Sequence, residues 1–286
     1  MFKEYYRLTK PGIIYGNSIN AAMGFAFASV LAWAFDLWLL LAVLGGTALV
    51  IASGCVFNNY IDRGIDQHMK RTQKRALVRG RVSGRNALIY ATLLGIAGFT
   101  TLALWTNWLT VLIGVIGYID YIVLYGYFKR KSVHGTLVGA ISGAMPPVAG
   151  YCAVTGQFDT AALLLFLILA AWQMPHFYAI AMYRQKDYAA AGIPVLPVAK
   201  NTQQTKIQIF VYVCLFILAT ILMSTFGYTG LIYLGVMTVL GAYWLQLAVQ
   251  GFSAPDEIKW ARKMFFFSLI VTLVVAVMLP LGALLP

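Results

Sequence analysis

Charged residues are scarce in this chain, and acidic residues are the scarcest of them. Lys, Arg, Asp and Glu make up 10% of the 286 residues, and only 9 residues are Asp or Glu. A soluble domain of this length carries about 25% charged residues, so the composition excludes an ordinary soluble fold. Apolar stretches close to 20 residues recur instead, without the alternation of a membrane β-barrel. The sequence therefore predicts an all-α, polytopic membrane protein.

Cysteine is also rare. The three cysteines, Cys55, Cys152 and Cys214, lie in apolar runs without the spacing of a disulfide framework or a metal site. We expect buried free thiols.

The chain shows no low-complexity segment, no fixed-period repeat and no boundary between domains, so residues 1–286 are expected to form a single domain. The N-terminal segment lacks a cleavable signal pattern and is expected to be retained.

Hydropathy predicts about nine membrane-spanning helices. They cover residues 12–32, 37–60, 87–105, 108–127, 135–154, 160–182, 206–226, 229–250 and 263–284. Four of the connections, near residues 33–36, 105–108, 155–159 and 226–229, are short and contain no Lys or Arg. The longer connections, about 61–86 and 183–205, are expected to form caps over the other face of a helical bundle.

The cations mark one side of the membrane. All 21 Lys and Arg residues lie in the N-terminal segment or in and beside the remaining connections, and eight of them fall between Arg63 and Arg85. The positive-inside rule places the N-terminus and these connections in the cytoplasm and, with nine spans, the C-terminus outside. The net charge of +12 would suit nucleic acid, but its placement indicates topology instead. We therefore expect a lipid bilayer and no nucleic acid as a partner.

A polar helix face begins inside the second span. Asn58, Asp62 and Asp66 stand at positions i, i+4 and i+8, so on a helix their side chains lie on one face. Two carboxylates and an amide with arginines just beyond them suit a magnesium ion that carries a phosphorylated ligand. The alternative is a polar helix end that faces water. Because the face starts within the membrane, where polar groups are costly, we favour a site.

Two further polar clusters lie on the same side of the membrane. Asp187 could supply another metal oxygen and Arg184 could hold phosphate, although an exposed loop is the alternative there. Residues 192–197 follow as a constrained, non-helical loop. Lys129 and Arg130 end the fourth span, where they are either interface anchors or groups that neutralise a diphosphate.

Span six and its neighbours contain polar residues and prolines deep in apolar segments. Pro175 is expected to disturb its helix, and residues 143–147 are expected to break or kink span five. His176 lies ~9 Å from the cytoplasmic end at 1.5 Å per residue. It could be a satisfied core residue, a base or a ligand to a metalloporphyrin. Asp120 is the only acid well inside a span, where it could pair with a Tyr or His or contact substrate.

Several segments in order along the chain resemble the intramembrane prenyltransferase superfamily of the UbiA type. They are residues 9–12 (TKPG), 52–63 (ASGCVFNNYIDR), 71–72 (RT), 129–130 (KR), 142–147 (SGAMPP), 172–177 (WQMPHF) and 191–197 (AGIPVLP). The last two are similar to the haem-farnesylating branch rather than to its quinone-type relatives. One departure is Lys186, which stands where the family often has a carboxylate and leaves Asp187 alone in the second acidic motif.

The resemblance implies a function and a set of site residues. It implies Mg²⁺-dependent transfer of a farnesyl group from farnesyl diphosphate to the 2-vinyl group of haem B, with water addition, to give haem O. The implied metal ligands are Asn58, Asp62, Asp66 and Asp187, which with His176 form the implied catalytic set. The implied diphosphate-binding cations are Arg71, Arg75, Lys129, Arg130 and Arg184, and the implied haem contacts are Trp172 and His176. It further implies a bacterial cytoplasmic (inner) membrane location, a site facing the cytoplasm, and a haem A synthase or terminal oxidase as the recipient of haem O.

Three alternatives remain at this stage. One is a prenyltransferase that acts on a quinone precursor or another aromatic compound. The second is a haem or lipid-phosphate transporter that uses the same cations for binding. The third is an assembly factor of a terminal oxidase that only holds haem. Consumption of farnesyl diphosphate that depends on haem would separate the expected enzyme from the first. A transporter predicts that Asp62→Ala leaves substrate movement intact. An assembly factor predicts that purified protein makes no haem O from haem B, farnesyl diphosphate and Mg²⁺.

Overall fold

The computed structural model describes residues 1–285, and every regular element in that range is helical. Nine helical segments within it are long and apolar enough to cross a membrane. They are α2 (Pro11–Leu31), α3 (Leu37–Asp66), α4 (Gly84–Trp105), Trp108–Lys131, α7 (Gly135–Thr155), α8 (Thr160–Tyr183), α11 (Thr202–Thr225), α12 (Leu231–Gln250) with its continuation to Ser253, and α13 (Glu257–Leu284). The segment Trp108–Lys131 comprises α5 (Trp108–Ile119), a π-helical turn (Asp120–Leu124) and α6 (Tyr125–Lys131). The predicted all-α bundle of nine spans is confirmed.

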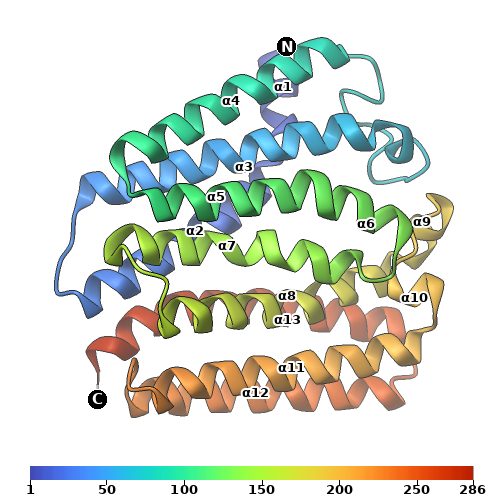
Figure 1. Cartoon of the computed structure of the whole chain (residues 1–286). Helices are drawn as coiled ribbons and strands as arrows, with labels where there is room; N and C mark the ends of the chain where they lie inside the picture. Colours follow the sequence, from blue (N-terminus) through green and yellow to red (C-terminus); the bar gives the residue numbers. More distant parts are fainter. Residues whose placement is uncertain (286) are drawn as a thin grey trace.

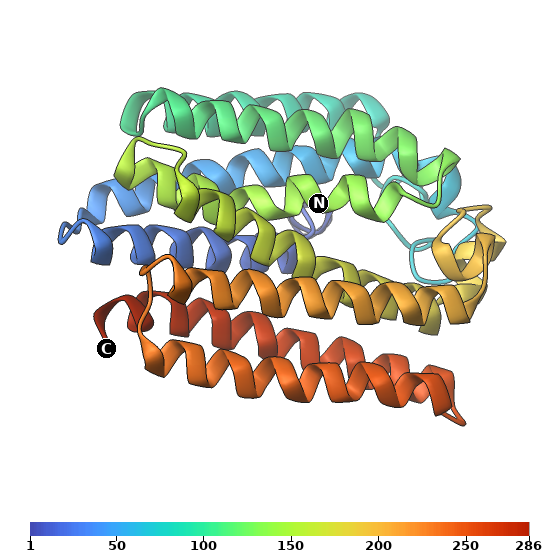
Figure 2. The ribbon, with the colours of Figure 1, turned by 60° about the horizontal axis from the view of Figure 1, so that its bottom comes forward.

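The long helices run side by side, and the short helices between α8 and α11 lie at one end of the bundle (Figure 1). That end carries α9 (Gln185–Ala190), α10 (Leu196–Ala199) and the connection of residues 67–83. Figure 2 shows α11, α12 and α13 together on one side of the bundle, with α4 on the opposite side. The short N-terminal helix α1 (Phe2–Leu8) lies beside α3 and leads into α2. The connections that contain α9, α10 and residues 67–83 therefore lie at one end of the bundle, and their role as caps stays a prediction.

Several of the scarce acidic residues start helices. Asp36 accepts hydrogen bonds from the backbone N–H groups of Trp38 and Leu39 at 2.8 and 3.1 Å. Asp159 and Asp256 cap α8 and α13 in the same way. A carboxylate at this position satisfies N–H groups that have no partner inside the helix. Three of the nine acids are therefore accounted for by local structure.

Small residues bring α2 and α7 into close contact. A Cβ on Gly24 would collide with the backbone carbonyl of Pro147, and a Cβ on Gly150 would collide with that of Ala21. Glycine permits this approach of two backbones, as is common between helices in membranes. The contact joins the first span to the fifth, and both helices line the cavity described below.

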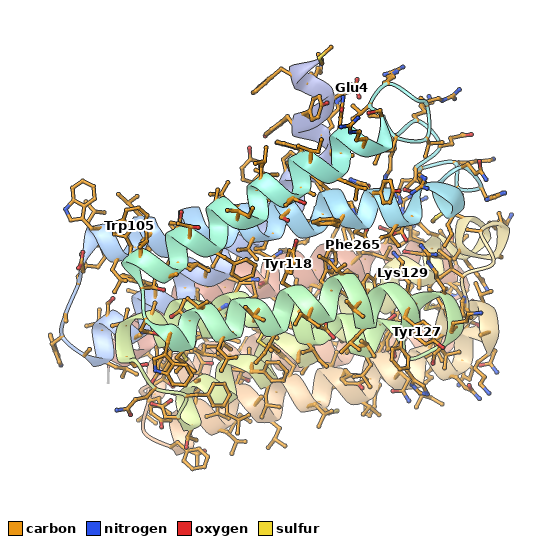
Figure 3. The ribbon with its side chains drawn as sticks, turned by 45° about the horizontal axis from the view of Figure 1, so that its top comes forward. Glu4, Trp105, Tyr118, Tyr127, Lys129 and Phe265 are labelled. Carbon is orange, nitrogen blue, oxygen red and sulfur yellow. The ribbon has the colours of Figure 1, made fainter. Side chains whose placement is uncertain are left out.

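The exterior of the bundle is apolar. Large hydrophobic side chains are exposed along the helices, and exposed tryptophans lie at the end opposite the caps, where Figure 3 labels Trp105. Nitrogen-tipped side chains gather at the other end, near Lys129 (Figure 3). An apolar belt with aromatic residues at its edge is typical of a protein in a bilayer.

Some local expectations were wrong or incomplete. Helix α3 continues to Asp66, so the first residues of the predicted loop 61–86 are helical. The segment predicted to be non-helical contains the single turn α10 (Leu196–Ala199), because Pro197 occupies a first-turn position where its missing N–H costs nothing. Helices α7 and α8 run without a break through their internal prolines. The cysteines are free as predicted, although Cys214 is only half-buried.

Candidate active site

The three polar residues of α3 face one cavity. Asn58, Asp62 and Asp66 are buried, with 3%, 6% and 5% of their surface exposed. All three line a cavity of about 890 Å³ that extends between the helices. The helical spacing places them on one face because α3 remains helical through Asp66. The prediction of a shared helix face is confirmed.

Two cations from α6 meet the central carboxylate. Lys129 Nζ forms an ion pair with Asp62 Oδ2, and Arg130 Nη2 lies 3.0 Å from Asp62 Oδ1. Arg130 also donates to the carbonyl oxygen of Ile61 at 2.8 Å. The fourth span therefore delivers both of its predicted cations to the acidic face of the second span.

The connection after α3 supplies a further cation. Arg75 Nη1 lies 2.6 Å from Asp66 Oδ2, and the Thr72 hydroxyl donates to the carbonyl oxygen of Asp66 at 2.8 Å. Arg71 and Arg75 both line the cavity. The connection thus folds back over the end of α3, and this brings two of its arginines to the site.

Lys10 is a site residue that sequence reasoning missed. Its Nζ donates to Asn58 Oδ1 at 2.6 Å, and it lines the cavity. Burial lowers the pKa of the Lys10 ammonium to about 8. Its backbone is left-handed, with φ 53°, directly before Pro11, which disfavours the helical conformation in the residue that precedes it. In the sequence, the only indication of this role was the position of Lys10 directly before Pro11, at the start of the first span.

Asn59 helps to place Lys10. Its Nδ2 donates to the carbonyl oxygen of Leu8 at 2.7 Å, and its side chain is buried. This bond connects α3 to Leu8, the last residue of α1, and Leu8 lies two residues before Lys10. The position of the lysine is therefore set by a contact between residues 51 positions apart.

The second predicted acidic cluster is only partly in the cavity. Arg184 and Tyr188 line it, whereas Asp187 is not among the lining residues. The Asp187 carboxylate lies 3.8 Å from Arg184 Nη1. In this arrangement Asp187 is placed to orient Arg184, and its role as a metal ligand stays a prediction.

The same cavity reaches the aromatic cluster in α8. Trp172, Gln173 and His176 line it, and the rings of Trp172 and His176 stack with centroids 5.0 Å apart at 26°. His176 is 9% exposed. The structure therefore brings the predicted haem contacts and the predicted diphosphate site into one continuous space.

Tyrosines of the fourth span form a wall of the cavity that sequence reasoning also missed. Tyr118, Tyr121 and Tyr125 line it, and the rings of Tyr121 and Tyr125 stack at 5.7 Å. Lys129 Nζ lies 5.1 Å from the centre of the Tyr125 ring. Their spacing of three and four residues was a visible signal of a common helix face.

Asp120 has a different partner from those considered in the sequence. Its Oδ2 accepts a hydrogen bond from the backbone N–H of Ser142 at 3.0 Å, and its other oxygen is buried without a partner. The residue begins the π-helical turn and is not among the cavity-lining residues. A role in joining the fourth and fifth spans therefore fits Asp120 better than contact with substrate.

The oxygen atoms on α3 suit a magnesium ion that is shared with a substrate. Within residues 1–285 no cluster of three or more His, Cys, Asp and Glu side chains could hold a metal alone. Mg²⁺, however, commonly binds through one or two carboxylates together with water and substrate phosphates. Asp62 and Asp66 provide that number, and Asn58 adds an amide oxygen. Asn58 Nδ2 is buried without a partner and, as a donor, suits an oxygen of the substrate phosphate. The donor set therefore fits such an ion.

Comparison with known proteins gives a consistent result. Residues 19–270 match the model of the UbiA prenyltransferase family. "Protoheme IX farnesyltransferase 2" of Pseudomonas putida (strain GB-1) is 52% identical over 278 residues, which cover 97% of this chain and 94% of the relative. "Protoheme IX farnesyltransferase" of Yersinia pseudotuberculosis (serotype O:1b, strain IP 31758) is 51% identical over 280 residues, covering 98% and 94%.

Solved structures share the fold at lower identity. A structure described as digeranylgeranylglyceryl phosphate synthase superposes with a TM-score of 0.81 and 20% identity, covering 99% of this chain and 98% of that one. A UbiA homolog from Archaeoglobus fulgidus bound to GPP and Mg²⁺ gives a TM-score of 0.73 and 16% identity, covering 96% and 99%. At these identities the comparison concerns the fold alone.

Proposed function

Because this chain belongs to the UbiA prenyltransferase family, we propose that it transfers a farnesyl group from farnesyl diphosphate to the 2-vinyl group of haem B, with water addition, to make haem O. The chain is an integral membrane prenyltransferase. Relatives named for farnesyl transfer to protohaem share about half of its residues over nearly the whole length. The observation that carries the proposal is the single cavity, which joins the Asn58, Asp62 and Asp66 face to Trp172 and His176.

The polar end of the cavity binds the diphosphate. Mg²⁺ would be held by Asn58, Asp62 and Asp66. Asp187, which pairs with Arg184 and is not among the cavity-lining residues, would add a further oxygen only at the edge of the site. When bound, the ion neutralises negative charge that develops on the departing diphosphate. A UbiA homolog of the same fold is described as bound to GPP and Mg²⁺, which supports a metal-dependent reaction.

The cations complete the diphosphate site. Six cations line the cavity or contact the acidic face: Lys10, Arg71, Arg75, Lys129, Arg130 and Arg184. Several are already held by carboxylates or an amide oxygen, so they need little reorganisation to meet the charge of the substrate. Preorganised charges of this kind stabilise a transition state more than mobile ones do.

The middle of the cavity protects the allylic cation that forms when diphosphate leaves. Apolar side chains such as Val50, Ile113 and Met145 line it and limit the access of water. The rings of Tyr118, Tyr121 and Tyr125 offer electron-rich faces on one side. These walls keep the cation available for the vinyl carbon of haem B.

The aromatic end of the cavity orients haem B. Trp172 and His176 stack on each other and present a flat surface and a ring nitrogen to a planar ligand. Attack of the vinyl group leaves a cation beside the porphyrin. Water adds to this cation and loses a proton, which gives the hydroxyl group of haem O. Gln173, which follows Trp172 in the sequence, also lines the cavity. Its side-chain Nε2 donates to the backbone carbonyl oxygens of Ala140 and Leu169.

The location follows from the charge distribution. The cation-rich end, with the site and the N-terminus, faces the cytoplasm, and the C-terminus lies outside the bacterial inner membrane. Residues 1–286 form one catalytic domain with cap segments over the site. The product passes to a haem A synthase or terminal oxidase, and the lipid bilayer is the other partner.

The test is reconstitution of the reaction with purified protein. Protein in lipid nanodiscs is incubated with farnesyl diphosphate, haem B and Mg²⁺, and haem O is measured by mass spectrometry. Formation of haem O that requires all three components supports the proposal. Transfer of the farnesyl group to 4-hydroxybenzoate without haem would favour the quinone-precursor alternative, and tight haem binding without product would favour a carrier or assembly role.

A further inference from the structure

Ser268 on α13 contacts the histidine of the cavity. Ser268 Oγ lies 2.8 Å from His176 Nδ1, although the two residues are 92 positions apart. The serine is fully buried, with 0% of its surface exposed. Its hydroxyl group also lies 2.6 Å from the carbonyl oxygen of Phe265, one turn earlier in the same helix.

These two contacts determine which nitrogen of His176 carries the proton. A serine hydroxyl has one hydrogen, and the Phe265 carbonyl oxygen can only accept it. Because that hydrogen is donated to Phe265, the Ser268 oxygen must act as acceptor toward the histidine. The proton of neutral His176 is therefore on Nδ1. Nε2 then carries a free lone pair, and it is the remaining polar atom of a ring that lines the cavity.

Ser268 also holds the neighbouring ring. Trp172 Nε1 donates to the Ser268 carbonyl oxygen at 2.7 Å. The rings of Trp172 and His176 are stacked, so two atoms of one serine set the positions of both rings. Phe265 and Phe177 pack on the histidine with centroids 4.9 and 5.2 Å away. The ring is therefore enclosed by uncharged groups.

We propose that Ser268 is a positioning residue that keeps His176 in the Nδ1–H form and directs its Nε2 lone pair to the iron of bound haem B. Histidines that bind metals commonly donate their other ring N–H to a fixed acceptor, which sets the ring orientation and tautomer. The uncharged surroundings do not offer the carboxylate that often supports a histidine base. This inference rests on the proposed function, because it assumes that haem B occupies the aromatic end of the cavity.

The test compares four variants in nanodiscs. Ser268→Ala removes the acceptor, Ser268→Thr keeps a hydroxyl, and His176→Ala removes the ring. Ser29→Ala is the matched control, because it removes a buried serine hydroxyl that has no hydrogen-bond partner. Haem B affinity is measured by titration, and the iron–histidine band of ferrous haem is measured by resonance Raman spectroscopy. Ring ¹⁵N shifts in the haem-free protein report the tautomer of His176 directly.

We expect the iron–histidine band in the wild-type protein, in S29A and in S268T. H176A should lose the band, and S268A should bind haem about 10- to 100-fold more weakly, with a weakened or shifted band and a mixture of tautomers. The inference is overturned if S268A matches the wild type in haem affinity, Raman band and ¹⁵N shifts, or if H176A retains the band. Wild-type protein that forms haem O without an iron–histidine band contradicts this inference alone. Wild-type protein that forms no haem O contradicts the proposed function.

Discussion

Lys129 and Asp62 form a largely buried ion pair between the fourth and second spans. Their side chains are 12% and 8% exposed, and the two residues are 67 positions apart in the sequence. Figure 3 labels Lys129 at the end of the bundle where the nitrogen-tipped side chains gather. Removing one member of a buried ion pair leaves the other charge without compensation, at a cost of about 3–5 kcal/mol. Because both residues also line the cavity, a substitution in this pair is expected to change both the free energy of unfolding and the reaction rate.

The first prediction concerns the central carboxylate. Asp62→Asn keeps the size of the side chain but removes the charge that faces Lys129 and Arg130, so we expect haem O formation to fall by about 10²- to 10³-fold. Asp187→Asn should cost less, because Asp187 is not among the cavity-lining residues. Initial rates by mass spectrometry give the ratio, and helical content by circular dichroism checks folding. A larger loss for D187N than for D62N would reverse the assigned order of importance.

The second prediction concerns Lys10. Lys10→Met removes a cation that lines the cavity and contacts Asn58, so we expect KM for farnesyl diphosphate to rise by about tenfold or more, as loss of a charged hydrogen bond of about 1.5–3 kcal/mol implies. KM for haem B should change little. Lys3→Met is the control, because Lys3 is exposed in α1. Equal kinetics for K10M and the wild type would exclude Lys10 from the diphosphate site.

The third prediction concerns the metal ion. Chelation by EDTA should abolish haem O formation, and added Mg²⁺ should restore it, because one or two carboxylates with substrate phosphates suffice to hold this ion. The affinity for Mg²⁺ should be much higher with farnesyl diphosphate present than without it, which isothermal titration calorimetry can measure. Full activity of chelated protein would show that the cations alone neutralise the diphosphate.

The fourth prediction concerns the contact between α2 and α7. Gly24→Ala places a methyl group against the Pro147 backbone and should destabilise the protein by about 1–3 kcal/mol. Gly45→Ala in α3 is the matched control, because no atom lies within 4 Å of the added Cβ, and alanine favours a helix. Thermal unfolding in detergent measures both variants. If G24A unfolds at the same temperature as G45A, the close contact does not limit stability.

Much of the fold could be predicted from the sequence because a membrane span is a local property. The length and hydropathy of contiguous residues were enough to place nine spans, and helical periodicity put Asn58, Asp62 and Asp66 on one face. The internal prolines did not predict where helices end, because α7 and α8 continue through theirs. Membrane-spanning helices tolerate internal proline, and α8 continues through Pro175.

The site was only partly predictable because its residues come together by packing. The proximity of Lys10 to Asn58 depends on how α1 and α3 meet, and the proximity of Ser268 to His176 depends on how α8 and α13 meet. No local pattern distinguishes Ser268 from other serines in apolar helices. Its hydrogen bonds identify it only when the two helices are seen together.

The sequence by itself determined that residues 1–285 form a helical bundle with nine candidate spans and an acidic helix face at its cation-rich side. Hydropathy, charge placement and helical period could do this because they are properties of neighbouring residues. The tertiary structure alone decided which cation meets which carboxylate, that the acidic face and the aromatic cluster share one cavity, and which nitrogen of His176 contacts Ser268. Contacts between residues 48 to 96 positions apart depend on the relative placement of whole helices, which packing sets and local sequence does not encode.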